Sequence, residues 1–190
     1  VGTLIAFFAT PALSSRTDKH TAAMWGILAV LFIAPAPIVL RLLGLMPENG
    51  HPALLPILIA YTTFIVYVAV TLTILIGSMI ADTIDENELN TGKRQEGLFN
   101  AAFGLTAKAT SGLGGFTAGI VLEIVDFPTG AAPGEVTVDT VFALGVGVGP
   151  GIFLFWVIAS LLLSRYGLRR SDHARIMAQL EERRRSAAAG

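Results

Sequence analysis

The chain has 190 residues, of which 53% are hydrophobic and only 14% charged, with a formal net charge of −1 and no cysteine. Soluble domains usually carry about a quarter charged residues, so the composition excludes an ordinary soluble domain. The lack of cysteine excludes disulfides and thiolate chemistry. No large basic soluble patch exists that would predict a nucleic-acid partner.

Four apolar blocks are long enough to cross a membrane, because about 20 helical residues span the roughly 30 Å of a bilayer core. Backbone groups in lipid must be hydrogen-bonded internally, so each block should be a helix. The sequence therefore predicts an all-α, polytopic transmembrane helix bundle whose partner is the lipid bilayer. The blocks are 22–45, 53–81, 97–125 and 141–163.

A fifth apolar block, residues 1–13, is too short to span, and the chain starts inside it with Val1. A signal peptide would start with Met and basic residues. We therefore expect residue 1 to be a cut point in a larger membrane protein. The bundle is predicted over 1–165 and a basic tail over 166–190.

The basic residues favour one side of the predicted bundle. Arg41 is the one basic residue near the other side, and Lys108 lies within a block. This asymmetry predicts a multi-pass protein of the cell (inner) membrane with its C-terminus in the cytoplasm. The eleven residues on the cytoplasmic side are Arg16, Lys19, Lys93, Arg94, Arg165, Arg169, Arg170, Arg175, Arg183, Arg184 and Arg185.

Ile176, Met177 and Leu180 lie among the arginines of the tail. This pattern suits a short amphipathic helix on an anionic leaflet. It suits a solvated, frayed tail equally well.

Lys108 stands near the middle of the block 97–125, where a charge costs at least roughly 2.5–3.5 kcal/mol. At about 100° per residue it shares a stripe with mostly small residues, which favour close helix packing. The bulky opposite side, including Phe103 and Val121, is expected to face lipid. The stripe comprises Ala101, Gly104, Lys108, Gly112, Gly115, Gly119 and Leu122.

Such a lysine is expected to pair with a carboxylate or a ligand. A structural ion pair, or a lysine that snorkels to an interface, is the alternative. Glu123 lies about 22 Å away along the helix. The partner of Lys108 should therefore belong to a part of the protein outside this chain.

Between two blocks lies the polar stretch 81–97. Asp82 and Asp85 are expected at the C-terminal end of their helix, where the dipole disfavours them, so Lys93, Arg94 or Arg16 should compensate. Glu96 suits the start of the next helix. These pairs could form in one conformation and break in another, and an ordinary solvated loop is the alternative.

Other motifs predict structure rather than chemistry. "GVGVGPG" (145–151) has Pro150 where a dinucleotide loop needs glycine, so close helix packing explains it better. Pro35 and Pro37 should kink or break their helix. The three histidines lie in separate loops and predict no metal site. No nucleophile–base set predicts an enzyme.

The stretch "ADTIDENELNTGKRQEGLF" closely resembles the signature of the glycoside–pentoside–hexuronide:cation symporters, the melibiose-carrier branch of the major facilitator superfamily. Glu86 departs from the family's tyrosine. Twelve residues after Glu96, Lys108 matches a lysine of the family's helix eleven. The matching signature positions are Ala81, Asp82, Asp85, Glu88, Gly92, Arg94, Glu96 and Gly97.

The resemblance implies the C-terminal half of a major facilitator, with the end of helix eight and helices nine to twelve. It implies alternating access, a small-molecule solute, no cofactor beyond a transported sodium ion or proton, and a missing N-terminal half of the same chain. The signature residues would form a cytoplasmic gate, and Lys108 would serve substrate and cation coupling.

The solute is less constrained, because Thr73 occupies the position of a tryptophan in melibiose-type carriers. "KATSGLGG" and the tail "EERRR" also resemble the sodium-dependent lysophospholipid symporters. A non-transporting membrane scaffold or receptor subunit is the alternative outside transport.

Overall fold

The computed structural model describes residues 1–128, 130–132 and 135–189, and the side chains of these residues other than Arg16 and 187–189. Within this part all regular structure is helical, which confirms the all-α prediction. The helices are α1 (Gly2–Arg16), α2 (Lys19–Ile33), α3 (Ala36–Leu42), α4 (Leu54–Thr91), α5 (Glu96–Ile124), α6 (Val138–Ser164) and α7 (Arg170–Ala189).

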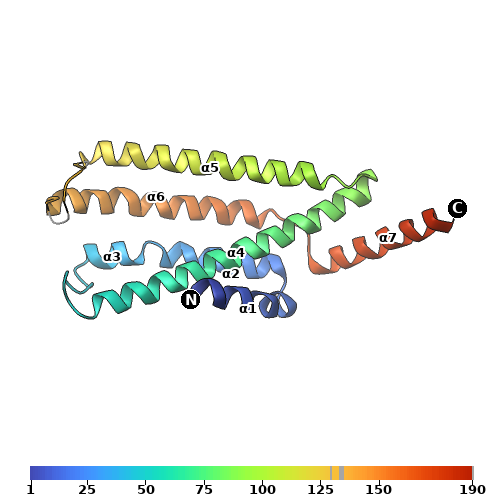
Figure 1. Ribbon diagram of the computed structural model, residues 1–190, viewed down its shortest axis with the longest axis horizontal. Coiled ribbons are helices and arrows are strands. Elements are labelled where there is room, and N and C mark those ends of the chain that lie inside the picture. Colours follow the sequence, from blue (N-terminus) through green and yellow to red (C-terminus); the bar gives the residue numbers. More distant parts are fainter. Residues whose placement is uncertain (129, 133–134, 190) are drawn as a thin grey trace.

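The helices α1 to α6 lie side by side along the long axis of the molecule (Figure 1). Helix α4 packs on α1 and α2, and α6 packs on α2, α3 and α5. The α1–α2, α4–α5 and α6–α7 connections share one end of the bundle, as the sequence predicts. We call it the basic end. Helix α4 continues past the neighbouring helices there, and α7 packs against it.

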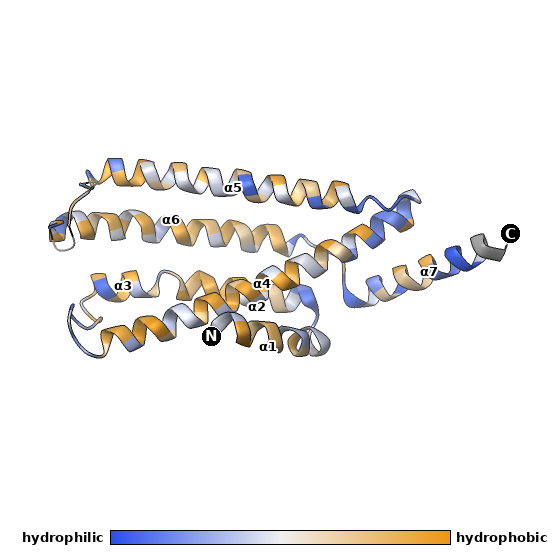
Figure 2. Cartoon of the chain, viewed as in Figure 1, coloured by the Kyte–Doolittle hydropathy of each residue, from blue (hydrophilic) through white to orange (hydrophobic). Residues whose placement is uncertain are grey.

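Three stretches are long and apolar enough to cross a membrane, namely Lys19–Leu42, Leu54–Thr91 and Val138–Ser164. The chain is therefore a multi-pass membrane protein. Helix α5 has 29 residues and is long enough, but it is not one of the three. Its glycines, threonines and Lys108 dilute its apolar character (Figure 2).

The predicted break at the paired prolines is confirmed. Helix α2 ends at Ile33, and α3 starts at Ala36. Proline has no amide hydrogen to donate to the preceding turn, so the break frees carbonyl groups. The hydroxyl of Tyr61 on α4 donates to the carbonyl of Ala34 over 2.9 Å, which ties the break to the bundle.

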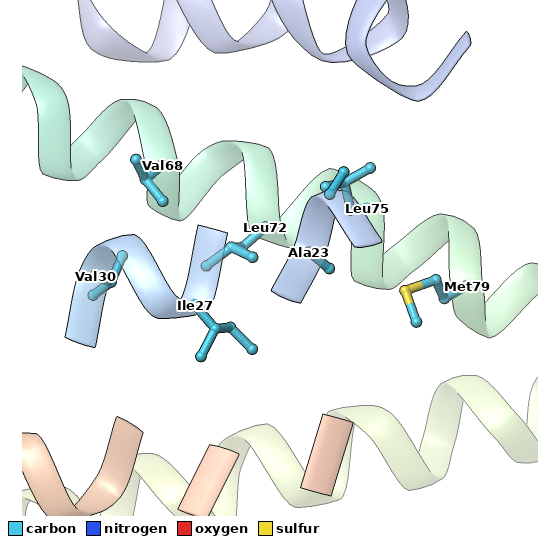
Figure 3. Packing of buried hydrophobic residues seen from close by; sticks show 8 residues of the cluster. Ala23, Ile27, Val30, Val68, Leu72, Leu75 and Met79 are labelled. Carbon is cyan, nitrogen blue, oxygen red and sulfur yellow. The ribbon is translucent and has the colours of Figure 1, made fainter. Parts of the chain in front are cut away.

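The apolar core lies between α2 and α4 (Figure 3). Small residues let these helices approach closely, and a Cβ on Gly26 would stand 2.9 Å from Leu72. Gly145 packs similarly on α3, since a Cβ there would meet Ile38 and Leu42 at 3.4 Å. This confirms the packing role expected of the glycine-rich motif at that position. The core residues are Ala22, Ala23, Ile27, Val30, Val68, Leu72, Leu75 and Met79.

Helix α4 runs ten residues beyond the predicted span and ends where Gly92 adopts a left-handed conformation, with φ of 70°. The amide of Gly92 donates to the carbonyl of Glu88 over 2.8 Å. A side chain with a Cβ strains this conformation, which glycine adopts freely.

We expect Gly92→Ala to destabilise the full-length protein by about 1–2 kcal/mol, and Gly92→Asn by less, because asparagine tolerates the left-handed region. Thermal unfolding of the purified variants measures the difference. Equal stability of the alanine variant and the natural protein would contradict this role of Gly92.

Candidate functional site

Three carboxylates line one side of α4 at the basic end, and we call Asp82, Asp85 and Glu88 the carboxylate row. The sequence places the first two at a helix end, which is wrong, because α4 continues to Thr91. Residues three apart on a helix are neighbours on one face. The longer helix therefore aligns three negative charges that a loop would scatter, and cations must balance them.

Asp82 is buried, with 7% of its surface exposed. Its two oxygens accept hydrogen bonds of 2.8 and 2.7 Å from Nζ of Lys19, the first residue of α2. Lys19 is not among the balancing cations that the sequence predicts, which are Lys93, Arg94 and Arg16. The side chain of Arg16 lies outside the described residues. Lys19 and Asp82 are both predicted on the cytoplasmic side of the bundle, and this shared location is the feature of the sequence that points to their pairing.

The Lys19–Asp82 pair predicts an energetic coupling that a double-mutant cycle with Lys19→Met and Asp82→Asn measures. We expect a coupling of roughly 0.5–3 kcal/mol in the free energy of unfolding, as found for residues in one network. Purely additive effects of the two substitutions would show that the pair contributes nothing.

Arg94 contacts three carboxylates at once, which confirms it as a compensating cation. Its Nη1 lies 3.1 Å from Asp85 and 3.0 Å from Glu88, and its Nε lies 3.3 Å from Glu96. Hydrogen bonds, led by the one to Glu88, raise the pKa of Arg94 above its ordinary value, so the guanidinium stays charged. Glu96 lies in the first turn of α5, as predicted.

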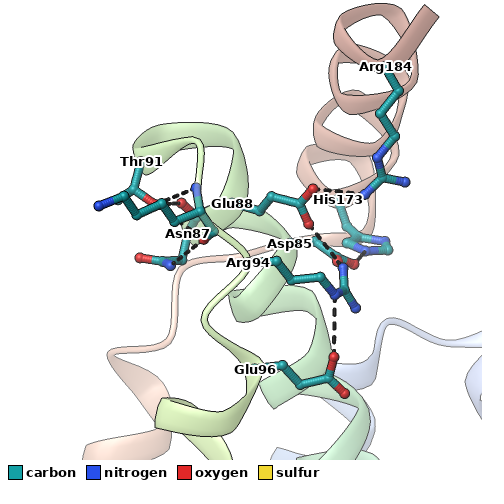
Figure 4. Close-up of polar contacts among 9 residues, drawn as sticks. Asp85, Asn87, Glu88, Thr91, Arg94, Glu96, His173 and Arg184 are labelled. Atoms are coloured by element: carbon teal, nitrogen blue, oxygen red, sulfur yellow. Dashed lines mark hydrogen bonds and ion pairs between the residues drawn. The ribbon is translucent and has the colours of Figure 1, made fainter. Parts of the chain in front are cut away.

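The connection between α4 and α5 positions Arg94. The side-chain amide of Asn87 donates to Oε1 of Gln95 over 3.1 Å, and the Lys93 amide donates to Thr91 over 3.3 Å. These contacts hold the short connection against the end of α4. The guanidinium of Arg94 thereby points back along the carboxylate row (Figure 4).

The tail helix α7 supplies further contacts to the carboxylate row, from His173 and Arg184. Nε2 of His173 lies 3.4 Å from Asp82 and 3.3 Å from Asp85, and Arg184 lies 2.9 Å from Glu88 (Figure 4). Ile176 and Leu180 of this helix are buried. The tail is thus an amphipathic helix, but it packs on α4 and is not a frayed tail.

A cavity of about 230 Å³ adjoins the network at Asp82, Lys19 and His173. About half of the Arg94 side chain is exposed, at 49%. Charged pairs with this much access to water are individually weak. The basic end therefore holds many exchangeable ionic contacts rather than one permanent pair.

Lys108 lies on α5 and is exposed, and the described residues place no carboxylate within ion-pair distance of it. A Cβ on Gly104, Gly112, Gly115 or Gly119 would meet no atom within 4 Å. The small-residue stripe is therefore uncovered within the described part of the chain. Gly97 likewise has open space around it.

The opposite side of α5 was expected to face lipid, and at Val121 this is wrong. A Cβ on Gly147 of α6 would lie 3.7 Å from Cγ1 of Val121. Gly147 leaves room there for the bulky side chain of Val121, so this side of α5 packs against α6. The stripe with Lys108 consequently points away from α6.

Residues 1–170 match the family described as "MFS/sugar transport protein". Over 114 residues the chain is 37% identical to an uncharacterized symporter, sll1374, of Synechocystis sp.. That similarity covers 57% of this chain and 21% of the relative, so it spans about a fifth of the relative's length. No solved structure matches the chain significantly.

Proposed function

Because this chain belongs to the MFS/sugar transport protein family, we propose that it is part of a secondary active transporter. The full protein would carry a glycoside-like solute together with a sodium ion or a proton by alternating access. The observation that carries this proposal is the ionic network around the carboxylate row, at one end of a bundle of membrane-spanning helices.

In this proposal the network is the C-terminal half's share of a cytoplasmic gate. Arg94 pairs with Asp85, Glu88 and Glu96 while about half exposed, so these contacts can be exchanged at low cost. Asp82 is the buried member of the gate and is held by Lys19. Gly92 and Gly97 bound the connection that carries Arg94. By the positive-inside rule, this end and the C-terminus would lie on the cytoplasmic side of the cell membrane.

Lys108 would face the central cavity together with the stripe of small residues. A cation at bilayer depth is costly unless it meets an anionic group or water. An N-terminal half of the same chain would cover the stripe at Gly104, Gly112, Gly115 and Gly119. It would also supply the anionic group that balances Lys108. Whether that ion pair is formed would depend on whether solute and cation are bound.

A lysolipid or other amphiphile is the second candidate solute, and Thr73 favours it. The Thr73 hydroxyl donates to the carbonyl of Ala69 in its own helix over 2.9 Å. Threonine has no aromatic ring, so this position offers no surface for a sugar ring to stack on.

The test uses the full-length protein in proteoliposomes, with uptake of a panel of glycosides and of lysolipids. Each is measured with an inward sodium gradient, with a proton gradient and with neither. Gradient-driven glycoside uptake supports the proposal, and lysolipid uptake alone supports the amphiphile symporter. Binding without any flux would contradict transport and favour a scaffold or receptor subunit.

A further inference from the structure

Four residues of α7 form one stripe along the helix. His173, Ile176, Leu180 and Arg184 follow one another at spacings of three, four and four, which places them on one face. Ile176 and Leu180 are 5% and 3% exposed, and α7 packs against α4. An apolar contact flanked by a histidine and an arginine thus fixes the tail helix to the bundle.

His173 and Arg184 of the stripe contact every member of the carboxylate row, and each of these carboxylates also contacts a cation from elsewhere. Asp82 lies between Lys19 and His173, and Asp85 between Arg94 and His173. Glu88 lies between Arg94 and Arg184. The tail therefore doubles the contacts of a row that already has partners in α2 and the α4–α5 connection.

Two further contacts reach backbone groups at the basic end. Nη1 of Arg170 donates to the carbonyl of Ser15 at the end of α1 over 2.9 Å. Arg183 donates to the carbonyl of Leu89 near the end of α4. The tail helix thus bridges α1 and α4 and holds the row from outside the bundle.

We propose that α7 is a strap on the carboxylate row, with His173 and Arg184 as positioning residues, and that it slows the opening of the gate. The inference rests on the transport function proposed above. Exchange of the row's partners requires the present contacts to break, and each contact from α7 adds to that barrier. Without the strap, Arg94 and Lys19 still hold the row, so the gate closes but opens faster.

Docking of the strap is tested first, independently of transport, by hydrogen exchange of residues 170–189 in the full-length protein. Leu180→Glu places a charge at a buried position of α7, and Gln179→Glu places the same charge at the exposed neighbouring position. We expect severalfold faster exchange of the α7 amides in the first variant only. Equal exchange in both variants would overturn the docking.

Transport is then measured with Arg184→Gln and its matched control Arg185→Gln. Arg185 pairs with Glu181 of its own helix and not with the row. We expect Arg184→Gln to raise the maximal uptake rate about two- to fivefold with an unchanged KM, the size of one partly exposed ion pair. Arg184→Lys should return the rate toward that of the natural protein, and Arg185→Gln should leave it unchanged.

An unchanged or lowered maximal rate in Arg184→Gln, at equal amounts of protein, would overturn the strap. If the natural protein moves no solute, the proposed function fails by itself. Hydrogen exchange still decides whether α7 docks, so the two failures are distinguishable.

Discussion

Replacement of Lys108 by alanine is expected to lower gradient-driven uptake by the full-length protein on the order of tenfold or more, with normal amounts of protein in the membrane. Lys108 is the one basic residue of α5 and lies near the middle of this helix. A charged side chain near the middle of a helix that crosses a bilayer costs roughly 2.5–3.5 kcal/mol or more on insertion scales. Removing it should therefore ease insertion while abolishing the coupling we assign to it.

The matched control is Thr110→Ala, two residues further along α5. The Thr110 hydroxyl donates to the carbonyl of Thr106 in its own helix over 2.8 Å, so its loss should leave uptake near the natural rate. Solute binding measured on the same variants separates loss of binding from loss of coupling. Normal accumulation by Lys108→Ala would contradict the proposed role of this lysine.

Hydropathy and periodicity predict the parts of this fold that depend on neighbours along the chain. The helix break at Pro35 and Pro37 is predicted from the missing amide donors. The place of Glu96 in the first turn of α5 is predicted from the preference of a carboxylate for a helix start. The basic end follows from counting lysines and arginines. Each inference uses a rule that acts within one helix or one connection.

The site depends on contacts between distant segments, which local rules leave open. Lys19 and Asp82 are 63 positions apart, and Arg184 and Glu88 are 96 apart. The most important difference from the prediction is the length of α4, which extends beyond the apolar block to Thr91. Once residues 82–91 are helical, three carboxylates align on one side, and α7 finds a face to pack on. The low hydropathy of residues 82–91 predicts a loop. Polar residues can nevertheless extend a helix that has already formed.

The face of α5 shows a different limit. The sequence separates its small side from its bulky side, but it does not say which side meets which neighbour. Val121 reaches α6 because Gly147 leaves space there. The assumption that bulky side chains face lipid fails where a glycine on the neighbouring helix leaves space for such a side chain.

Arg94→Gln is expected to have the second large effect, a loss of coupled uptake by about tenfold or more. Arg94 reaches Asp85, Glu88 and Glu96 together, whereas each other basic side chain of the network reaches one or two carboxylates. Its removal leaves Glu96 without its cation and lets the row repel itself. In the proposed gate this prevents closure, which the tail helix alone cannot restore.

Lys93→Gln is the matched control, since it removes the same charge from the same connection without touching the row. Arg94→Lys should recover only part of the uptake, because an ammonium is a compact charge and lacks the planar fork with which a guanidinium bridges several carboxylates. Equal losses in Lys93→Gln and Arg94→Gln would mean that the net charge of the connection matters and the geometry of Arg94 does not. Full recovery by Arg94→Lys would show that one point charge suffices to close the gate.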